Sequence, residues 1–587
     1  MADSKETASA AHVESLSDND NEKSLDLKLN PIITDTAEYG DIDADGPGEA
    51  GMTKAKLLAI IALALSYMTS MQQSNCTASI MRQIDIRLGP TTYYNWMLST
   101  FTIAQATTLP LSGGLSDIYG RRNFFLAGCC ISLLGCIIAA AAQSTAMMIA
   151  AEGIKGIGLA AVSELVPRKH RGYVQAAFDL LSLPWIIFGA LTGNAMVKYH
   201  TLSFRINYII GTILNLLSFA AAYFWYHPPA GLAMIGRSRW RQTMDLDWLG
   251  VFLMACGVVL FLVGIGLGGV NFPWESAGAI APIVVGGFLI ISFGIWEWKF
   301  ASNPFLTHDL FTPDTRRTFC LYLPITFVGG MGIYSAAAFW TQQMMAMFET
   351  DPIKLGVLSI PGGFGASFGG FLGGVLIGKH KIFNSTYMLL YGLFFKMIGD
   401  GLMTTIGPNN LSRALGAGFI SMVGVGWLTV SSIVVVQLCC ADIHIGLTTL
   451  LTGSTRSIGG SVAVVIYTTV LHNVLGKDAG QQIAKAVVPL GAPLQSLPAL
   501  TATLISGKTK DVLKIPGITP TILQAAKDAI EYSWALGFKY IYVTSLAFGA
   551  CAVILACFTK DVTQNMTNSV SVRLQNEKST GDQKVVA

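Results

Sequence analysis

Ionisable residues inside long apolar stretches are the features of this 587-residue chain that can do chemistry. Glu152 and Lys155 lie three residues apart in one such stretch, Asp179 lies in the next, and Arg456 lies in a later one. At the centre of a bilayer a charge costs about 2.5–3.5 kcal/mol on insertion scales, so it normally faces a cavity or a partner. A carboxylate in that position can carry a proton, and an arginine can bind an anion or a carbonyl group.

Glu152 is the first candidate proton carrier, because a buried carboxylate without a strong partner can hold a proton near neutral pH. Lys155 opposes this role if it pairs with Glu152, since residues three apart share a helix face. Asp179 is the second candidate, near the predicted cytoplasmic edge of its helix. Arg456 either binds substrate or tunes a nearby carboxylate, and the alternative is a structural contact with backbone carbonyls or lipid headgroups.

Amide and aromatic side chains in the same stretches are candidates for lining a substrate cavity. Such groups suit a partly apolar ligand of medium size. The alternative for each is helix packing, in which an interhelical hydrogen bond contributes about 0.6 kcal/mol. The candidates, together with Arg456, are Gln72, Gln105, Tyr334 and Gln342.

The elements that position these residues are apolar blocks, which repeat from Ala55 to Phe558. Each block has about 20 residues and can cross about 30 Å of hydrocarbon. Hydrophobic residues make up 52% of the chain and charged residues only 12%, about half the charged share of soluble domains. We therefore predict an all-α integral membrane protein with fourteen transmembrane helices. Their ranges are 55–75, 93–113, 124–142, 146–163, 176–197, 206–226, 248–269, 277–297, 318–340, 355–378, 384–406, 412–437, 444–471 and 534–558.

The positions of Lys and Arg orient these helices. Basic residues gather in alternate connections, such as Arg121 with Arg122, 168–171, 237–241 and 379–381, and are sparse in the others. Because the bias runs one way through the chain, we predict an even number of spans with both termini in the cytosol.

The segment before the first predicted span is polar and acidic. Residues 1–50 hold thirteen acidic and three basic residues and no long apolar run, so a disordered tail precedes the first span. That span follows fifty polar residues and is expected to act as a signal anchor rather than a cleaved signal peptide.

Several other classes of protein are disfavoured. No Cys-x-x-Cys pair has histidine partners, and no nucleophile–base pair or nucleotide-binding loop is evident. We expect no enzyme, no metal site and no nucleic-acid partner.

The most specific motif is Gly-Gly-Leu-Ser-Asp-Ile-Tyr-Gly-Arg-Arg at 113–122, between the second and third predicted helices. Gly120 permits a tight turn, and Asp117 is an anion that can meet a helix amino terminus. A simple anchor loop would explain Arg121 and Arg122 but not the Gly/Asp/Gly spacing. The segment resembles the signature loop of the major facilitator superfamily, in which this loop latches two halves in the outward-facing state. The run at 378–381 looks like a degenerate second copy.

This resemblance implies the major facilitator fold, in which two six-helix bundles rock about a central cavity. Fourteen spans resemble the branch with two helices inserted between the bundles. Segments 163–172, 456–467 and 533–542 resemble fungal trichothecene efflux pumps and their siderophore-transporter relatives. The resemblance implies a latch of Asp117, Gly120, Arg121, Arg122, Glu164 and Arg171.

The chain departs from the family pattern in two places. The fourth helix is shorter than in relatives, and the fifth has Leu183-Pro184-Trp185 where a Gly-Pro pair is expected. The second departure weakens the inference that the protein exports its substrate.

In the family layout the helix of Lys396 and Asp400 is peripheral, so we expect these residues, four apart, to form a structural pair.

Glycines fill the predicted helix 355–378. Gly365, Gly369 and Gly373 lie four residues apart and therefore share one face. Small residues on one face let another helix approach closely.

The expected organisation has seven parts. They are an acidic cytosolic tail (1–50), an N-terminal six-helix bundle (51–226), a basic cytosolic loop (227–247), two inserted helices (248–297), a cytosolic loop (298–317), a C-terminal six-helix bundle (318–560) with a long extracellular loop (472–533), and a cytosolic tail (561–587). Within the extracellular loop, 516–531 is a candidate surface helix.

The resemblance implies a secondary active transporter of fungal origin that exports a secondary metabolite or toxin by proton antiport. Siderophore-iron uptake by the same fold is the close alternative, and a non-transporting membrane sensor is the alternative from another class. Few of the eight histidines fall at predicted outer positions, which favours export over binding of a ferric chelate. We expect no cofactor, the proton gradient as energy source, a small-molecule substrate and a monomer in the plasma membrane, with a vacuolar or vesicle membrane as the alternative.

Overall fold

The computed structural model describes most of the chain after residue 53. The described ranges are 54–89, 96–156, 171–227, 239–244, 247–268, 272–301, 316–440, 445–505 and 515–565. The chain divides into residues 1–51 and residues 52–587, and all described residues lie in the second unit. The predicted cytosolic tails, except 561–565, and most of the loops 227–247 and 298–317 therefore lie outside the described residues.

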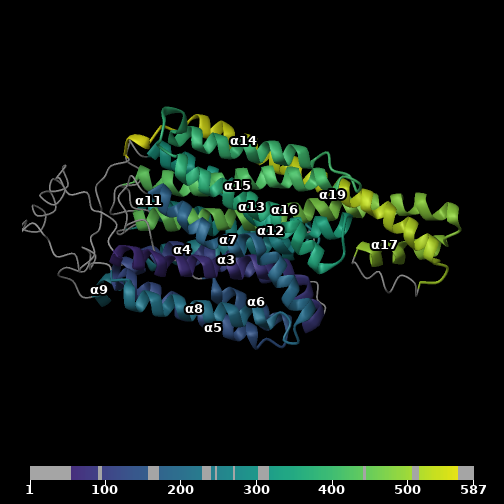
Figure 1. The fold of residues 1–587 in the computed structure, drawn as a ribbon, viewed down its shortest axis with the longest axis horizontal. Coiled ribbons are helices and arrows are strands. Elements are labelled where there is room, and N and C mark those ends of the chain that lie inside the picture. The colour runs from purple at the N-terminus through teal and green to yellow at the C-terminus, as the bar shows by residue number, and fades with distance from the viewer. Residues whose placement is uncertain are drawn as a thin grey trace, which may run out of the picture. The chain divides into compact units, whose positions relative to one another are not determined.

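Long α-helices make up the described part of the chain (Figure 1). Before the middle of the chain they are α3 (Lys54–Leu88), α4 (Trp96–Tyr119), α5 (Arg121–Ala140), α6 (Thr145–Lys155), α7 (Arg171–Tyr199), α8 (Arg205–Trp225), the short α9 (Arg239–Met244), α10 (Trp248–Leu267) and α11 (Ala277–Lys299). After it they are α12 (Arg316–Met347), α13 (Pro352–Leu376), α14 (Ser385–Met403), α15 (Leu411–Cys439), α16 (Ile445–Val487), the short α17 (Leu497–Ile505) and α19 (Pro520–Cys557).

Each of the fourteen predicted ranges overlaps one of these helices. Within the described residues, nine helices are long and apolar enough to cross a membrane. Fourteen spans therefore remain a prediction. The fourth predicted range, 146–163, coincides with α6 only as far as Lys155, and its remainder lies outside the described residues apart from Gly156.

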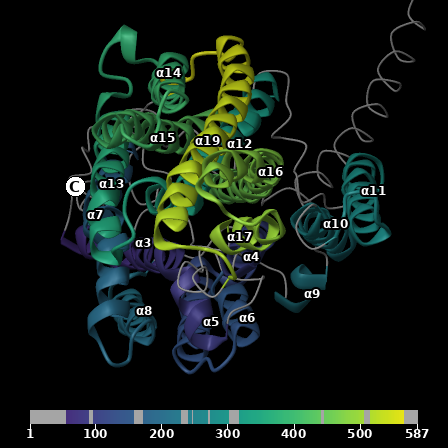
Figure 2. The same ribbon diagram turned by 90° about the vertical axis from the view of Figure 1, so that its right-hand side faces the viewer.

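The helices associate in two groups that follow chain order (Figure 1 and Figure 2). In the first, α3 packs on α7 and α8, α5 on α6 and α8, and α4 on α6. In the second, α15 packs on α13 and α14, and α19 on α12, α14 and α16. We call α3–α8 the N-terminal half and α12–α16 with α19 the C-terminal half. Contacts of α7 with α13 and of α4 with α16 join the two halves.

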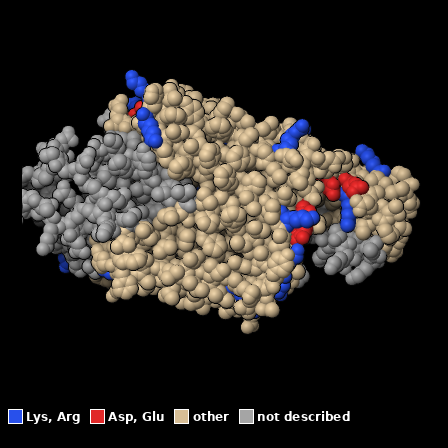
Figure 3. Space-filling view, viewed as in Figure 1, with Lys and Arg blue, Asp and Glu red and all other residues tan. Residues whose placement is uncertain are grey.

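The helices between the halves form a hairpin. α10 and α11 pack on each other, and α10 also contacts α4 and α16 (Figure 2). Many of their large apolar side chains are exposed, including Phe252, Phe288 and Ile291. In the face drawn in Figure 3, Lys, Arg, Asp and Glu gather toward the ends of the described helices and leave a broad uncharged zone between them. Such a surface suits lipid contact.

Glycines set the close packing of α13 on α15. A Cβ added at Gly365, Gly369 or Gly373 would meet the backbone of Phe419, Val423 or Trp427. The four-residue spacing on α13 therefore matches a four-residue spacing on α15, which confirms the predicted close-approach face. From the other helix, a Cβ at Gly426 would overlap the backbone of Ala366.

The segment 472–533, expected to be a loop, is largely helical. α16 continues to Val487, and α19 begins at Pro520, close to the start of the candidate surface helix. Both extensions bury an apolar stripe, with Ile483 and Val487 packed in one cluster with Ile522 and Ile530. Hydropathy shows where a helix leaves the membrane but not where the helix ends. These helices are amphipathic beyond that point, and they continue because their apolar faces pack on each other.

Two turns contain a glycine with a positive φ. Gly120 separates α4 from α5 with a φ of 88°, and Gly378 follows α13 with a φ of 74°. Both values lie in the left-handed region that glycine adopts without strain. The signature-like segment and its degenerate copy therefore each contain a glycine with a positive φ.

The α13–α15 contact generates a test of packing. Gly426→Ala places a methyl group against the Ala366 backbone, and such overpacking costs about 1–3 kcal/mol. Gly416→Ala on the same helix meets nothing within 4 Å and is the matched control. We expect thermal unfolding of the purified protein in detergent to show a lower midpoint for Gly426→Ala only. Equal midpoints for both variants would contradict the packing.

Candidate functional site

A cavity of about 260 Å³ lies between the two halves. The N-terminal half contributes residues of α3 and α7, and the C-terminal half contributes residues of all six of its helices. Tyr67, Asn75 and Ile187 lie on the first wall, opposite Trp340, Met422 and Tyr542 on the second. The mixture of aromatic, apolar and few polar groups is typical of small-molecule sites.

All charged residues that line the cavity belong to the C-terminal half. They are Lys396 and Asp400 on α14 and Arg456 on α16. Lys396 and Asp400 form the expected pair, and α14 lies at the edge of the C-terminal half, where it packs on α15 and α19 (Figure 2), but the pair also faces the cavity. Sequence spacing could show that the two residues share a helix face, but not which neighbours that face meets.

Asp400 is the centre of a buried network. Its Oδ2 accepts hydrogen bonds from Lys396 Nζ at 2.6 Å and from Ser545 at 2.7 Å. Its Oδ1 accepts from Ser421 at 2.6 Å, and Lys396 also donates to Ser545 at 2.7 Å. Lys396 is 2% and Asp400 4% exposed, so the charges compensate each other away from bulk water. The network joins α14, α15 and α19.

A second polar group joins the two halves beside the cavity. The Tyr334 hydroxyl donates to Gln105 Oε1 at 2.9 Å, and Ser457 donates to the same oxygen at 3.1 Å. One turn away, Ser461 donates to Thr102 at 2.9 Å. Two predicted cavity residues, Gln105 of α4 and Tyr334 of α12, thus lie in direct contact across the boundary between the halves.

The remaining predicted cavity residues are distributed differently. Arg456 lines the cavity and, among the described residues, makes no side-chain hydrogen bond or ion pair. Gln72, Gln105 and Gln342 are outside the lining of this cavity. Gln72 is fully buried within the N-terminal half, where its amide donates a hydrogen bond to Asn207.

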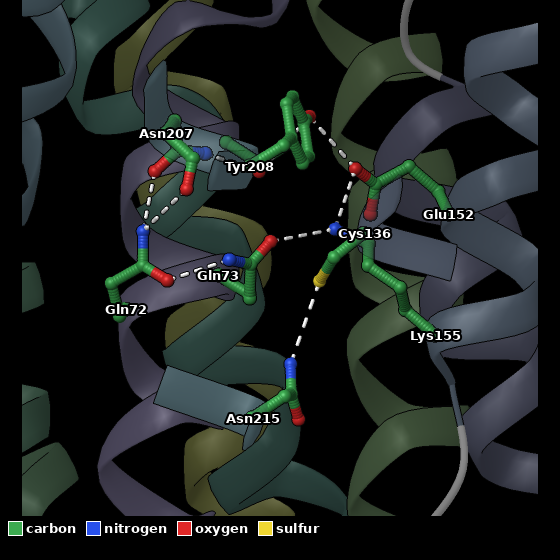
Figure 4. A network of polar contacts seen from close by, with 9 residues as sticks. Gln72, Gln73, Cys136, Glu152, Lys155, Asn207, Tyr208 and Asn215 are labelled. Carbon is green, nitrogen blue, oxygen red and sulfur yellow. Dashed lines mark hydrogen bonds and ion pairs between the residues drawn. The ribbon is translucent and has the colours of Figure 1, made fainter. Parts of the chain in front are cut away.

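Figure 4 shows the network that contains Glu152. Glu152 Oε1 lies 2.8 Å from Lys155 Nζ and accepts a hydrogen bond from Tyr208 at 2.9 Å. Lys155 also donates to Gln73 at 3.0 Å, and its ammonium group lies 4.7 Å from the centre of the Tyr208 ring. The chain of contacts continues from Gln73 to Gln72. It ties α3, α6 and α8 together.

The predicted Glu152–Lys155 pair thus exists and is buried. Glu152 is 2% and Lys155 4% exposed, and neither lines the cavity. Lys155 and Tyr208 both contact Oε1 of Glu152. Sequence reasoning did not identify Asn207 or Tyr208, since uncharged polar residues are common in membrane helices and nothing in their spacing distinguishes these two.

An exposed ion pair also joins the halves. Lys198 at the end of α7 lies 2.8 Å from Asp351, which caps the amino terminus of α13. The hydrogen bond from Lys198 lowers the pKa of the Asp351 carboxyl below its ordinary value, as does the bond from the Ile353 amide. Both side chains are more than a third exposed, so this pair is a weak link between halves.

Most of the predicted latch lies outside the described residues. Glu164 is outside them entirely, and the structure describes no side chain for Asp117, Arg121, Arg171 or the second proton candidate, Asp179. Arg122 is described, and its guanidinium donates to the Tyr223 carbonyl and covers the Tyr223 ring. It therefore ties the start of α5 to the end of α8. Among the described residues, no group of three or more His, Cys, Asp and Glu could hold a metal ion.

Comparisons with known proteins agree on one group of transporters. A sequence model of the fungal trichothecene efflux pumps matches residues 20–586. The trichothecene efflux pump TRI12 of Fusarium sporotrichioides is 24% identical over 578 residues, which cover 95% of each chain. The MFS-type transporter prx5 of Penicillium rubens is 27% identical over 540 residues, 90% of this chain and 95% of the relative.

Solved structures show the same fold. The human organic anion transporter MFSD10 (TETRAN) has a TM-score of 0.51 and 11% identity, over 85% of this chain and 99% of its own. A POT family peptide transporter has a TM-score of 0.50 and 14% identity, over 85% and 96%. The expected all-α transporter fold in a multi-pass membrane protein is thereby confirmed.

The Glu152–Lys155 pair generates a test of stability. Lys155→Met leaves a buried carboxylate without its counter-charge, which costs about 3–5 kcal/mol. Combining it with Glu152→Leu removes both charges and should recover much of the loss. We expect the single variant to melt well below the double variant in detergent. Lys354→Met, which breaks the exposed pair with Glu349, is the control and should change the midpoint little. Single and double variants with the same midpoint would contradict a coupled pair.

Proposed function

Because the chain belongs to the fungal trichothecene efflux pump family, we propose that it exports a fungal secondary metabolite or toxin by alternating access. The family assignment covers nearly the whole chain, and several relatives are named efflux pumps, including dotC of Dothistroma septosporum. These names support export over siderophore uptake or sensing.

The observation that carries the mechanism is a cavity lined by both halves. Substrate held between two bundles can face either side of the membrane when one bundle rocks against the other. Among the described residues, the bonds across the boundary are mostly neutral, such as Tyr334 to Gln105, whereas each half has its own charged network. This contrast supports movement of the halves as bodies.

Proton entry is the proposed energy source, with Glu152 as carrier and Asp179 as the second candidate. A proton bound at Glu152 would neutralise the carboxylate and release Lys155 from the ion pair. Lys155 would then keep only its contacts with Gln73 and the Tyr208 ring. Since this network links α3, α6 and α8, protonation can change how these helices pack.

The latch is proposed to act at the ends of the same helices. Gly120 supplies the turn, and Arg122 holds α5 against α8. Asp117, Arg121, Glu164 and Arg171 would complete the latch by the family resemblance. The substrate crosses without covalent change, so we propose neither an enzymatic reaction nor a cofactor.

We propose a monomer in the plasma membrane with both termini in the cytosol and without a nucleic-acid partner. The small-molecule substrate and the lipid bilayer are the partners that the family assignment implies.

Deletion of the gene in its host tests the function whatever the substrate is. We expect at least one secondary metabolite to accumulate inside the cells and to fall in the medium, at high and low iron alike. Complementation with the wild-type chain should restore export, whereas Glu152→Gln should not. Glu349→Gln, an acid-to-amide change in the connection between α12 and α13, is the matched control and should restore it.

A different outcome would refute the proposal. Loss of ferric-siderophore uptake under iron limitation, with metabolite export unchanged, would assign the protein to uptake. Full export by Glu152→Gln would remove Glu152 from the proton pathway.

A further inference from the structure

Large aromatic side chains are exposed at the end of the α10–α11 hairpin where α10 begins and α11 finishes. Trp240 of α9 is 66% exposed and Trp298 of α11 is 72% exposed. Trp248 and Phe300, at the same end, are also exposed. Tryptophan is enriched where a membrane helix reaches the headgroup layer. We therefore place α9 and this end of the hairpin at the membrane surface, on the cytosolic side in the proposed topology.

The fully exposed charges described at this end of the hairpin are basic. Arg241 of α9 and Lys299 of α11 are exposed. The two described acids beside them already have partners or are buried. Asp247 accepts hydrogen bonds from a backbone amide in the first turn of α10 at 2.9 Å and from the Trp296 indole at 2.7 Å, and Glu297 is buried. The surface offered to the membrane here is thus aromatic and cationic.

The sequence that leads into α10 carries charge of the same sign. Residues 227–244 contain three arginines and no acidic residue, and Asp245, which follows, lies outside the described residues. A cluster of basic residues beside a membrane helix is attracted to a leaflet that contains anionic lipids. Phosphatidylserine and phosphatidylinositol carry a net negative charge, whereas phosphatidylcholine does not. Charge complementarity therefore favours anionic headgroups at this surface.

α9 is also bonded to the end of α4. The Thr243 hydroxyl donates to the Tyr119 hydroxyl at 3.1 Å, and the Trp248 indole donates to the Thr243 carbonyl at 2.8 Å. Tyr119 is the last residue of α4 and precedes Gly120, whose positive φ makes the turn into α5. A partner that holds α9 at the membrane surface therefore also acts on the signature turn.

We propose that α9 and the adjacent end of the α10–α11 hairpin bind the headgroups of anionic phospholipids, and that this contact steadies the signature turn. Phosphate oxygens accept charge-assisted hydrogen bonds from guanidinium and ammonium groups such as those of Arg241 and Lys299. Headgroup binding goes beyond the proposed export and does not depend on it. The effect on the turn rests on the proposed latch and deepens it.

Local fluorescence quenching tests the lipid contact on the purified full-length protein in nanodiscs. Met244→Cys, at an exposed position of α9, is labelled with bimane in a chain whose ten native cysteines are replaced by serine. The nanodiscs hold phosphatidylserine and phosphatidylcholine in equal amounts, and one of the two is brominated in the upper acyl chain. We expect phosphatidylserine to be enriched about fivefold or more at the label. The enrichment should fall in concentrated salt, which screens exposed charges.

Variants locate the binding. Arg241→Gln and Lys299→Gln should each lower the enrichment by up to about fivefold, and the two together should abolish it. Arg241→Lys keeps the charge and should retain it. Lys485→Gln is the matched control, because it removes an exposed charge at the end of α16 that packs on α17, far from α9 in Figure 1. It should bind as the wild type does.

Hydrogen exchange of backbone amides tests the effect on the turn. Peptides that cover 113–123 should exchange more slowly in nanodiscs with phosphatidylserine than in nanodiscs of phosphatidylcholine alone. Tyr119→Phe removes the hydroxyl group that Thr243 reaches. It should abolish this difference in exchange and leave the lipid enrichment unchanged. Tyr387→Phe makes the same change at an exposed position of α14 and should retain the difference.

Equal quenching by the two brominated lipids, or wild-type enrichment in the Arg241→Gln/Lys299→Gln double variant, would overturn the proposal. So would equal exchange of the turn in both lipid mixtures. Elution of each variant as a single species in size-exclusion chromatography excludes misfolding, and Arg241→Lys against Arg241→Gln decides the matter if the double variant aggregates. Failure of export itself would appear in the metabolite profile of the deletion strain, independently of the lipid measurements.

Discussion

A charge in the hydrocarbon interior normally faces a partner within the protein or a cavity, and this constraint organises the described helices. Glu152 with Lys155 satisfies it in the N-terminal half, and Lys396 with Asp400 satisfies it in the C-terminal half. Hydroxyl and amide groups complete both networks, so each network ties together three helices of its own half. The strongest polar interactions thus lie within the halves.

Contacts between the halves are of a different kind. Gly356 and Gly363 of α13 let its backbone approach Leu191 and Ile186 of α7. The hydrogen bonds across the boundary join neutral groups, each of which contributes about 0.5–1.5 kcal/mol, and the Lys198–Asp351 pair is exposed. Charged networks within the halves and neutral contacts between them suit a rocking motion, and the cavity lies on the boundary.

Much of this architecture could be predicted from the sequence. The apolar blocks placed every long helix, and the four-residue glycine spacing on α13 identified the face that packs on α15. Tyr334 and Arg456 line the cavity between the halves, and their contact with substrate stays a prediction.

The helix ends and side-chain neighbours that could not be predicted from the sequence have a common physical origin. Hydropathy does not mark the end of an amphipathic helix, so α16 and α19 run further than expected. The spacing of Lys396 and Asp400 showed a pair but not its surroundings, because the neighbours of α14 come from α15 and α19, distant in the chain. The partners of Glu152 likewise come from α3 and α8.

The central claim is that this cavity opens to each side of the membrane in turn under the control of a proton gradient. Its most direct test is labelling of the thiol introduced by Ser335→Cys, in the cavity lining, in a chain whose ten native cysteines are replaced by serine. A membrane-impermeant maleimide is applied to sealed vesicles of either orientation, with and without an imposed pH gradient. The account predicts labelling from both sides, with the preferred side shifted by the gradient. Labelling from one side only, under every condition, would contradict it.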